Sequence, residues 1–247
     1  MRRRTLLLAA TGAAVPVAVM ESRANSAGPR TTVFPLPHGH AGSVAFSPDG
    51  KTLAAGLSGV QGIHSTLRLW DVARGTATTP WPDQVEELTK VAFSPDGKTL
   101  ATDSDDLTES PVRLWDLRTH TVATTLDAPR RHGFNPVAFA SKGTIMATGS
   151  ADNIVRVWDS GTSYVYAPLT GHTGPVTTVA FSPDGDTLAT GSEDRTVRLW
   201  DTSSLDVFPL DTLTGHTDKV TTLAFSPDGK TLASGSLDAT VRLWPTR

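Results

Sequence analysis

The sequence predicts an all-β fold, a β-propeller of five four-stranded blades. The first observation is a repeat, because one pattern, read most fully from Val179 to Asp201, occurs five times. The second is its period, since the Trp near the end of each copy recurs after 45, 43, 42 and 44 residues, as expected for one propeller blade per copy. The third is the alternation of residue types within each copy, which is typical of strands. The copies span about residues 39–71, 83–116, 130–159, 171–201 and 215–244.

The fourth copy shows how one blade is built. Residues 178–182 alternate, with Val179 and Phe181 on one face, as a half-buried strand requires. The SPDG string that follows predicts a hairpin turn, because its Pro presets one backbone angle and its Gly supplies a positive φ. A second strand is expected at 187–192, where small residues on one face let the neighbouring blade approach closely. The β-branched and aromatic residues of 196–200 predict the third strand.

The fourth strand of each blade is the most variable. It is predicted at 164–169 and 206–210, where Pro residues suit an edge strand that lacks a partner on one side. The fifth copy ends after its third strand at Trp244, whereas VFPL at 33–36 is identical to the string at 207–210. We therefore expect the N-terminal strand to complete the last blade and close the ring, which removes open sheet edges.

Composition is compatible with one folded domain and limits its chemistry. The chain has 247 residues, of which 38% are hydrophobic and none is Cys. Disulfides, thiolate metal sites and a Cys nucleophile are therefore excluded. Of the 22 basic and 25 acidic residues, four and one lie in residues 1–26, so the expected propeller domain, residues 27–247, carries 18 against 24 and a net charge of −6. An acidic domain of this kind is a poor binder of nucleic acid.

Residues 1–26 have the pattern of an export signal. Three Arg residues, Arg2 to Arg4, precede an apolar run from Leu6 to Val19, and small residues lead to an expected cleavage after Ser26 or Ala24. The RRTLL string within it resembles a twin-arginine signal. We therefore expect an exported protein with no stable membrane insertion once the signal is removed, or a cytoplasmic protein if the segment is not a working signal.

The repeated residues resemble those of the WD-repeat β-propeller family, which has a GH pair, an SPDG turn, an Asp before the third strand and a WD pair at its end. The match runs from about Gly39 to Trp244. The resemblance implies that a network of His, Ser or Thr, Asp and Trp braces each blade and satisfies its buried polar groups. The matching residues are His172, Thr190, Asp194 and Trp200 in the fourth copy, and His216, Ser234, Asp238 and Trp244 in the fifth. The third copy keeps Thr148, Asp152 and Trp158, but its His132 lies two residues nearer the strand.

The first two copies depart from this pattern. Both lengthen the loop between the second and third strands, with insertions at 57–65 and 103–110, so the loops should project from the same rim of adjacent blades. The second insertion is acidic, which favours a basic or polar partner, or a loop that is simply solvated. Because the family usually has seven blades, a degenerate fragment or an arc that dimerises are alternatives to a closed ring, although the VFPL match favours closure.

The resemblance also implies a partner-binding face, because such propellers often bind at the turn before the first strand of each blade. The candidate residues there are mostly small and polar, which favours a protein or peptide contact of modest affinity. They are Glu87, Thr89, Asn135, Thr177, Glu193, Lys219 and Thr221. Trp81, which stands between two Pro residues, is a further candidate, as an exposed anchor or as a residue packed under its loop.

We therefore expect a non-catalytic scaffold for protein–protein interaction, with no cofactor and no metal site. A grouping of Ser, His and Asp resembles a hydrolase triad, but its recurrence in successive copies argues for a structural role. The alternative is an extracytoplasmic propeller enzyme, of hydrolase or lactonase type, with a site in the central channel. No HExxH, GxSxG or phosphate-loop motif supports that alternative.

Overall fold

The structure, a computed structural model, describes Val33 and residues 40–58, 66–78, 88–104, 112–126, 136–142, 144–162, 164–204 and 206–246. In these residues it is all β, with five antiparallel sheets and no helix. The predicted propeller of five blades is confirmed, and each blade corresponds to one copy of the repeat.

The strands follow one another in chain order within each blade. The first blade contains β1 (His40–Phe46), β2 (Thr52–Ser58), β3 (Thr66–Asp71) and β4 (Thr76–Thr78). The second contains β5 (Leu88–Phe93), β6 (Thr99–Ser104), β7 (Val112–Asp116) and β8 (Thr121–Leu126). The third contains β9 (Val137–Phe139), β10 (Ile145–Gly149), β11 (Val155–Asp159) and β12 (Val165–Leu169). The fourth contains β13 (Val176–Phe181), β14 (Thr187–Ser192), β15 (Val197–Asp201) and β16 (Phe208–Leu213), and the fifth β17 (Val220–Phe225), β18 (Thr231–Ser236) and β19 (Val241–Pro245).

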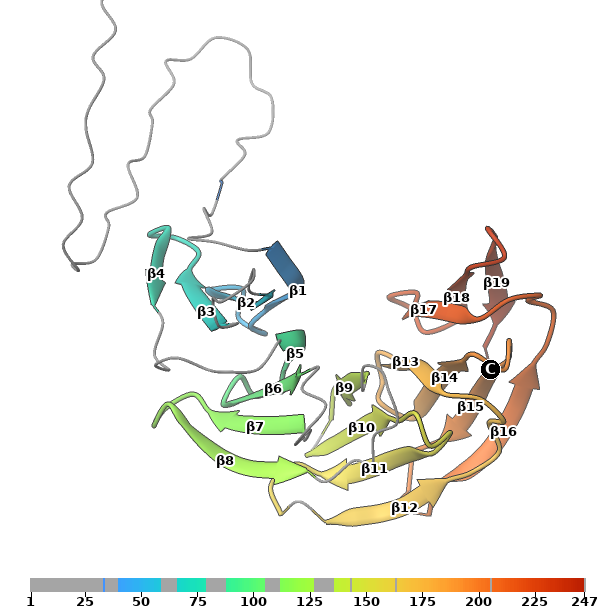
Figure 1. The fold of residues 1–247 in the computed structure, drawn as a ribbon. Helices are drawn as coiled ribbons and strands as arrows, with labels where there is room; N and C mark the ends of the chain where they lie inside the picture. Colours follow the sequence, from blue (N-terminus) through green and yellow to red (C-terminus); the bar gives the residue numbers. More distant parts are fainter. Residues whose placement is uncertain are drawn as a thin grey trace, which may run out of the picture.

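The blades stand around a ring, with their first strands nearest the centre and their fourth strands on the outside (Figure 1). The fifth blade has three strands among the described residues. The strand expected to complete it, at 33–36, lies outside those residues except for Val33, which is exposed and belongs to no strand. Completion of the last blade by this segment therefore stays a prediction.

The SPDG turn joins the first and second strands in four of the blades. In the fourth blade, the Ser182 hydroxyl donates to Asp184 Oδ1 at 2.5 Å and accepts the amide of Thr187 at 2.9 Å. Gly185 has a φ of 78°, in the left-handed region that favours glycine. The same pair of hydrogen bonds recurs in the first, second and fifth blades. The recurring Asp of this turn is thus occupied in holding the turn.

Apolar junctions hold neighbouring blades together. At the junction of the fourth and fifth blades, Val197 and Leu199 of β15 pack with Val220, Leu223 and Leu232 of β17 and β18. Equivalent clusters join the first blade to the second, the second to the third and the third to the fourth. The described residues thus form four packed junctions between blades.

Glycines let the blades approach closely at these junctions. A Cβ on Gly149 of β10 would lie 2.5 Å from Val176 Cγ1 of the fourth blade, and a Cβ on Gly191 of β14 would lie 2.7 Å from Val220 Cγ1 of the fifth. Real Cβ atoms do not approach other carbons so closely, so these positions require glycine. This agrees with the small residues expected on one face of the second strand of the repeat.

Candidate functional site

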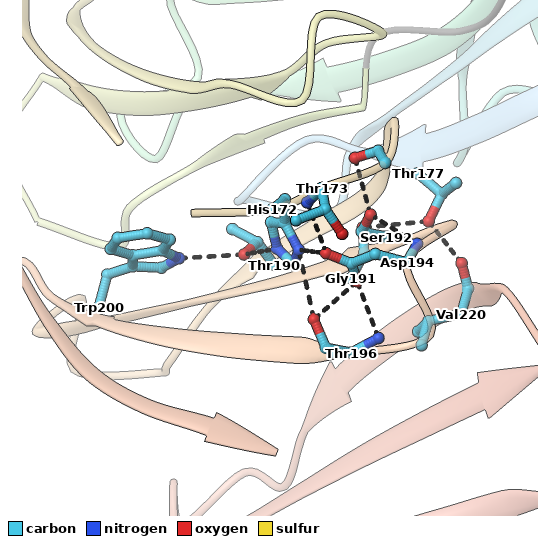
Figure 2. Close-up of polar contacts among 11 residues, drawn as sticks. His172, Thr173, Thr177, Thr190, Gly191, Ser192, Asp194, Thr196, Trp200 and Val220 are labelled. Carbon is cyan, nitrogen blue, oxygen red and sulfur yellow. Dashed lines mark hydrogen bonds and ion pairs between the residues drawn. The ribbon is translucent and has the colours of Figure 1, made fainter. Parts of the chain in front are cut away.

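Four side chains of the fourth blade form one continuous chain of hydrogen bonds (Figure 2). The indole Nε1 of Trp200 lies 3.0 Å from Thr190 Oγ1, and the same hydroxyl lies 2.8 Å from His172 Nε2. His172 Nδ1 lies 2.8 Å from Asp194 Oδ2. His172 lies before β13, Thr190 is in β14, Asp194 is in the turn after it and Trp200 is in β15. These hydrogen bonds therefore tie the segment that enters the blade to its second and third strands.

The protonation states fix which group donates and which accepts in each of these hydrogen bonds. An ionised carboxylate only accepts, so His172 Nδ1 donates to Asp194, and the neutral ring accepts the Thr190 hydroxyl at Nε2. The Thr190 oxygen then accepts the Trp200 N–H. Burial lowers the pKa of His172 by more than the neighbouring carboxylate raises it, so the ring is neutral at pH 7. Although burial raises the pKa of Asp194, hydrogen bonds led by the Thr196 hydroxyl lower it to about 2.

Asp194 has further donors that the sequence analysis did not include. The Thr196 hydroxyl donates to Oδ1 at 2.7 Å and the Thr196 amide at 2.9 Å, while the Thr173 amide donates to Oδ2 at 3.0 Å. Thr240 repeats the contact in the fifth blade, with its hydroxyl 2.6 Å from Asp238 Oδ1. A Thr two positions after the Asp in both copies was the sequence signal for this contact.

The fifth blade carries the same network with Ser in place of Thr. Ser234 Oγ lies 2.8 Å from His216 Nε2, and His216 Nδ1 lies 2.8 Å from Asp238 Oδ2. Hydrogen bonds led by the Thr240 hydroxyl hold the pKa of Asp238 below its ordinary value. These distances resemble a catalytic triad, but Ser234 is 1% exposed and its oxygen accepts the Trp244 indole at 2.8 Å. A nucleophile must reach a substrate carbonyl, whereas this hydroxyl is enclosed within its blade.

The other three blades keep parts of the network. Trp158 Nε1 donates to Thr148 Oγ1 at 2.8 Å in the third blade, and Trp115 Nε1 donates to Thr102 Oγ1 at 2.9 Å in the second. In the third blade Arg156 Nη2 lies 2.7 Å from Asp152 Oδ2 and so supplies a cation to the Asp. His132 lies outside the described residues, so its expected bond stays untested. In the first blade, Ala55 stands in register opposite Arg68, where the fourth blade has Thr190.

In the fourth and fifth blades, the Gly of the GH pair packs against the recurring Arg of the third strand. Gly171 has a φ of 142°, and a Cβ there would lie 2.6 Å from Arg198 Nη1. Gly215 repeats the arrangement, with a Cβ position 2.9 Å from Arg242 Nη1. The Arg that occurs in every copy therefore has a scaffold role in these two blades, which explains why Gly precedes the His.

Four of the candidate partner-binding residues come together where the fourth blade meets the fifth. We call the edge on which the first strands begin and the second strands end the His edge (residues 171–177, 193–196, 215–221 and 237–240). The Thr177 hydroxyl donates to the carbonyl of Gly191 at 3.1 Å and also to that of Val220 in the next blade. Lys219 Nζ lies 3.4 Å from Glu193 Oε1, and both side chains remain partly exposed. The exposed Thr221 donates to the carbonyl of Gly235 at 3.3 Å.

The remaining candidates are not placed together with these four. Thr89 belongs to β5, at the His edge of the second blade. Glu87, Asn135 and Trp81 lie outside the described residues, as do residues 59–65 and 105–110 of the two inserted loops. A partner-binding role for any of these residues stays a prediction.

A pocket of about 640 Å³ lies between the first and second blades, at the opposite edge, which we call the SPDG edge. Trp70, Phe93 and His120 contribute to its lining, and Asp49 and Asp96 of the two SPDG turns lie at it. Each of these carboxylates accepts the Ser hydroxyl of its own turn at 2.7 Å. The sequence analysis did not predict this pocket, because it depends on how two blades meet.

Among the described residues, no group of three or more His, Asp or Glu side chains is placed to hold a metal ion. In the same part of the chain, no helix has the length and apolar character needed to cross a membrane.

Comparison with known proteins points to one family. The family model described as WD domain, G-beta repeat matches residues 30–71, 135–159, 163–201 and 208–245. These stretches leave out the second copy of the repeat, which departs from the common pattern. The Periodic tryptophan protein 2 homolog of Dictyostelium discoideum is 33% identical over 66 residues, which cover 27% of this chain and 7% of that protein. The chain therefore matches only a small part of that relative.

Proposed function

Since this chain belongs to the WD-repeat family, we propose that it is a non-catalytic scaffold that binds a protein or peptide partner at the His edge of its propeller. The buried polar side chains of the repeat are used within the blades, so recognition falls to residues that differ between copies. The observation that carries the proposal is the group at the junction of the fourth and fifth blades. There Glu193 and Lys219 form a partly exposed ion pair beside the exposed Thr221.

This group suits a polar peptide segment. It presents one carboxylate, one ammonium group and several hydroxyl groups along a line that crosses two blades, whereas large apolar anchors are few. Such contacts give specificity through hydrogen bonds and complementary charge more than through buried area. A partner that carries both charges next to each other would replace the weak Glu193–Lys219 pair with two pairs of its own.

The experiment is affinity enrichment from host extract with the full chain, compared with two double variants. Glu193→Ala with Lys219→Ala removes the ion pair at the His edge. Lys142→Ala with Asp186→Ala is the matched control, because that pair also bridges two blades at 3.4 Å but lies at the SPDG edge. Surface pairs of this kind contribute little to stability, so both variants should fold.

We expect one protein to be recovered with the wild type and the control, and about tenfold less of it with the His-edge variant. Equal recovery with all three would place binding elsewhere on the propeller. Loss with the control alone would favour the SPDG edge and contradict the proposal.

We further propose that the protein is exported. The support is the order of basic, apolar and small residues within 1–26. The test is N-terminal sequencing of the protein secreted by the host from a C-terminally tagged gene. A new N-terminus after Ser26 or Ala24 is expected, whereas an intact N-terminus on cell-retained protein would contradict export.

A further inference from the structure

The pocket between the first and second blades has a lining that is partly apolar and partly acidic. Its volume of about 640 Å³ lies within the range of about 300–1,000 Å³ that is usual for ligand pockets. Leu69, Phe93 and Leu117 of the apolar junction line it, and the last two are only half-buried. The carboxylates of Asp49 and Asp96 line it as well, and each of these side chains is 56% exposed. The pocket therefore offers apolar contact and negative charge together.

Each of these two carboxylates has one oxygen that its own turn does not use fully. In both, Oδ1 accepts the Ser hydroxyl and the Lys amide of the SPDG turn. These hydrogen bonds, led by the one from the Ser hydroxyl, hold the pKa of Asp49 and of Asp96 below its ordinary value. The other oxygen, Oδ2, lies 3.6 Å from Lys51 Nζ in the first turn and 3.7 Å from Lys98 Nζ in the second. These Lys side chains are 83% and 82% exposed, so the pairs are weak and easily exchanged for another cation.

The rest of the lining does not balance this charge. A third carboxylate, that of Asp71, is held by Arg74 at 2.6 Å and is thus already paired. No Lys or Arg is among the residues that line the pocket. The chain as a whole is also acidic, with 25 acidic and 22 basic residues, so its field attracts a basic partner.

Another junction shows a cation at the same edge. Between the third and fourth blades, Lys142 Nζ lies 3.4 Å from Asp186 Oδ2, so one blade supplies an ammonium group to a carboxylate of the next. Between the first and second blades, no hydrogen bond or ion pair joins the two SPDG turns, all of whose residues the structure describes. These turns meet only where a Cβ on Gly97 would lie 3.6 Å from Pro48 Cδ. The cation at this junction has to come from another molecule.

We propose that this pocket binds a basic side chain of a partner peptide, best an arginine, with its stem on Phe93 and Leu117 and its charged end at Asp49 and Asp96. Basic side chains combine an apolar stem with a cationic end, and a guanidinium carries enough donors to reach two carboxylates. The site lies at a packed junction, so it does not depend on how the last blade is completed. It adds a second recognition site on the edge opposite the His edge and is independent of the partner proposed there.

The test is a calorimetric titration of the full chain with acetyl-Gly-Arg-Leu-Arg-Gly amide. The same peptide with citrulline in place of both arginines keeps the shape and removes the charge. Asp49→Asn with Asp96→Asn removes both carboxylates of the pocket. Asp184→Asn with Asp228→Asn is the matched control, because these residues accept the same Ser hydroxyl in the turns of the fourth and fifth blades.

The control matches the pocket variant in everything except the pocket. Both variants change the net charge equally, and the turns of the fourth and fifth blades also meet where a Cβ on Gly229 would lie 3.6 Å from Pro183 Cδ. At that junction, however, Thr246 takes the place of Leu117, since its amide donates to Lys230 as the amide of Leu117 donates to Lys98. A difference between the variants therefore reports on the pocket and not on SPDG turns in general.

We expect the arginine peptide to bind the wild type and the control variant equally, and the pocket variant about tenfold or more weakly. The citrulline peptide should bind the wild type about tenfold or more weakly as well. Absence of binding to the wild type, equal binding of both peptides, or equal loss in both variants would each overturn the proposal. Glu193→Ala with Lys219→Ala should leave this binding unchanged, which separates it from the function proposed for the His edge.

Far-UV circular dichroism checks that the variants fold. If the pocket variant unfolds, His120→Lys replaces it, because it leaves both SPDG turns intact and places an ammonium group on the exposed part of the lining. This variant should also weaken the arginine peptide about tenfold, whereas unchanged binding would overturn the proposal.

Discussion

At the scale of single residues, Thr190 is the centre of the fourth blade's network. Its hydroxyl is the only link between the Trp200 indole and the His172 ring in the described hydrogen bonds. One hydroxyl therefore satisfies two buried ring nitrogens. The loss of an unreplaced buried partner costs more than the bond itself contributes, because the partner's desolvation is no longer offset.

We expect Thr190→Val to destabilise the protein by about 1–3 kcal/mol for each ring nitrogen left without a partner. The measurement is the free energy of unfolding in denaturant. Thr190→Ser should keep most of the stability, since the fifth blade uses Ser234 at this position. Thr212→Val on the exposed face of β16 is the control and should change stability by less than about 0.5 kcal/mol. Equal effects at both Thr positions would contradict the role of the network.

The same network makes stability fall in acid. The pKa of His172 is below its ordinary value in the folded state, so between the ordinary value of about 6.5 and the folded one the unfolded chain binds more protons. Unfolding is therefore favoured as the pH drops through this range. A second loss is expected below about pH 4, where the unfolded Asp194 takes up a proton while the folded carboxyl, with its pKa of about 2, does not.

We expect the free energy of unfolding to decrease from pH 7 to pH 5.5 in the wild type, and to decrease less in His172→Gln, which removes the titrating ring. Denaturant unfolding at closely spaced pH values measures both slopes. Identical slopes in the two proteins would show that His172 does not contribute to the acid sensitivity.

At the scale of the element, the third and fourth blades are each joined to the next blade at a glycine of the second strand, Gly149 in β10 and Gly191 in β14. Gly149 of β10 contacts Val176 and Pro136, so no larger residue fits between the strand and the start of the fourth blade. Glycine is unfavourable within a strand. The distance between β10 and the fourth blade nevertheless leaves room for no other residue. Packing between blades therefore outweighs strand propensity in determining the residue at this position.

Gly149→Ala should destabilise the protein by about 1–3 kcal/mol, because the added methyl overpacks the junction. The double variant Gly149→Ala with Val176→Ala should recover part of this loss, since it removes the atom 2.5 Å from the new Cβ. The two effects are measured as free energies of unfolding in a double-mutant cycle. Strict additivity would indicate that the two residues do not contact each other.

Much of the blade was predictable from sequence, because the repeat requires particular side chains at each position. The SPDG turns and the third strands that carry the Trp followed from recurrence, whereas the residues of the His172 network followed from the resemblance to the WD-repeat family. The outer strand was predicted at 206–210 but is found at Phe208–Leu213, because its outer edge has no partner that would demand a fixed residue type. The bond from Thr177 to the carbonyl of Val220 joins two blades, and no pattern within one repeat contains such information.

At the scale of the whole molecule, the blades differ in how firmly they are held. The fourth blade has a complete network and a packed junction on each side. Among the described residues the first blade has one junction, and Ala55 stands where other blades carry the network hydroxyl. Local stability in repeat proteins is close to the sum of intrinsic and neighbour contributions, so these differences should be visible in a single molecule.

We expect amide hydrogen exchange to be slowest in β14 and β15 and fastest in β1 and β2. Exchange measured by mass spectrometry on peptides from each blade tests this order. Uniform protection in all five blades would mean that the array opens as one cooperative unit.

The recurring junction between blades bears on how such chains change over evolutionary time. A tandem duplication that adds one repeat, or a deletion that removes one, again places the third strand of one blade against the first two strands of the next. The new neighbours fit without any compensating substitution, because every repeat brings both surfaces with it. Array length can therefore vary by whole repeats in a lineage, while substitutions accumulate at positions outside the junctions.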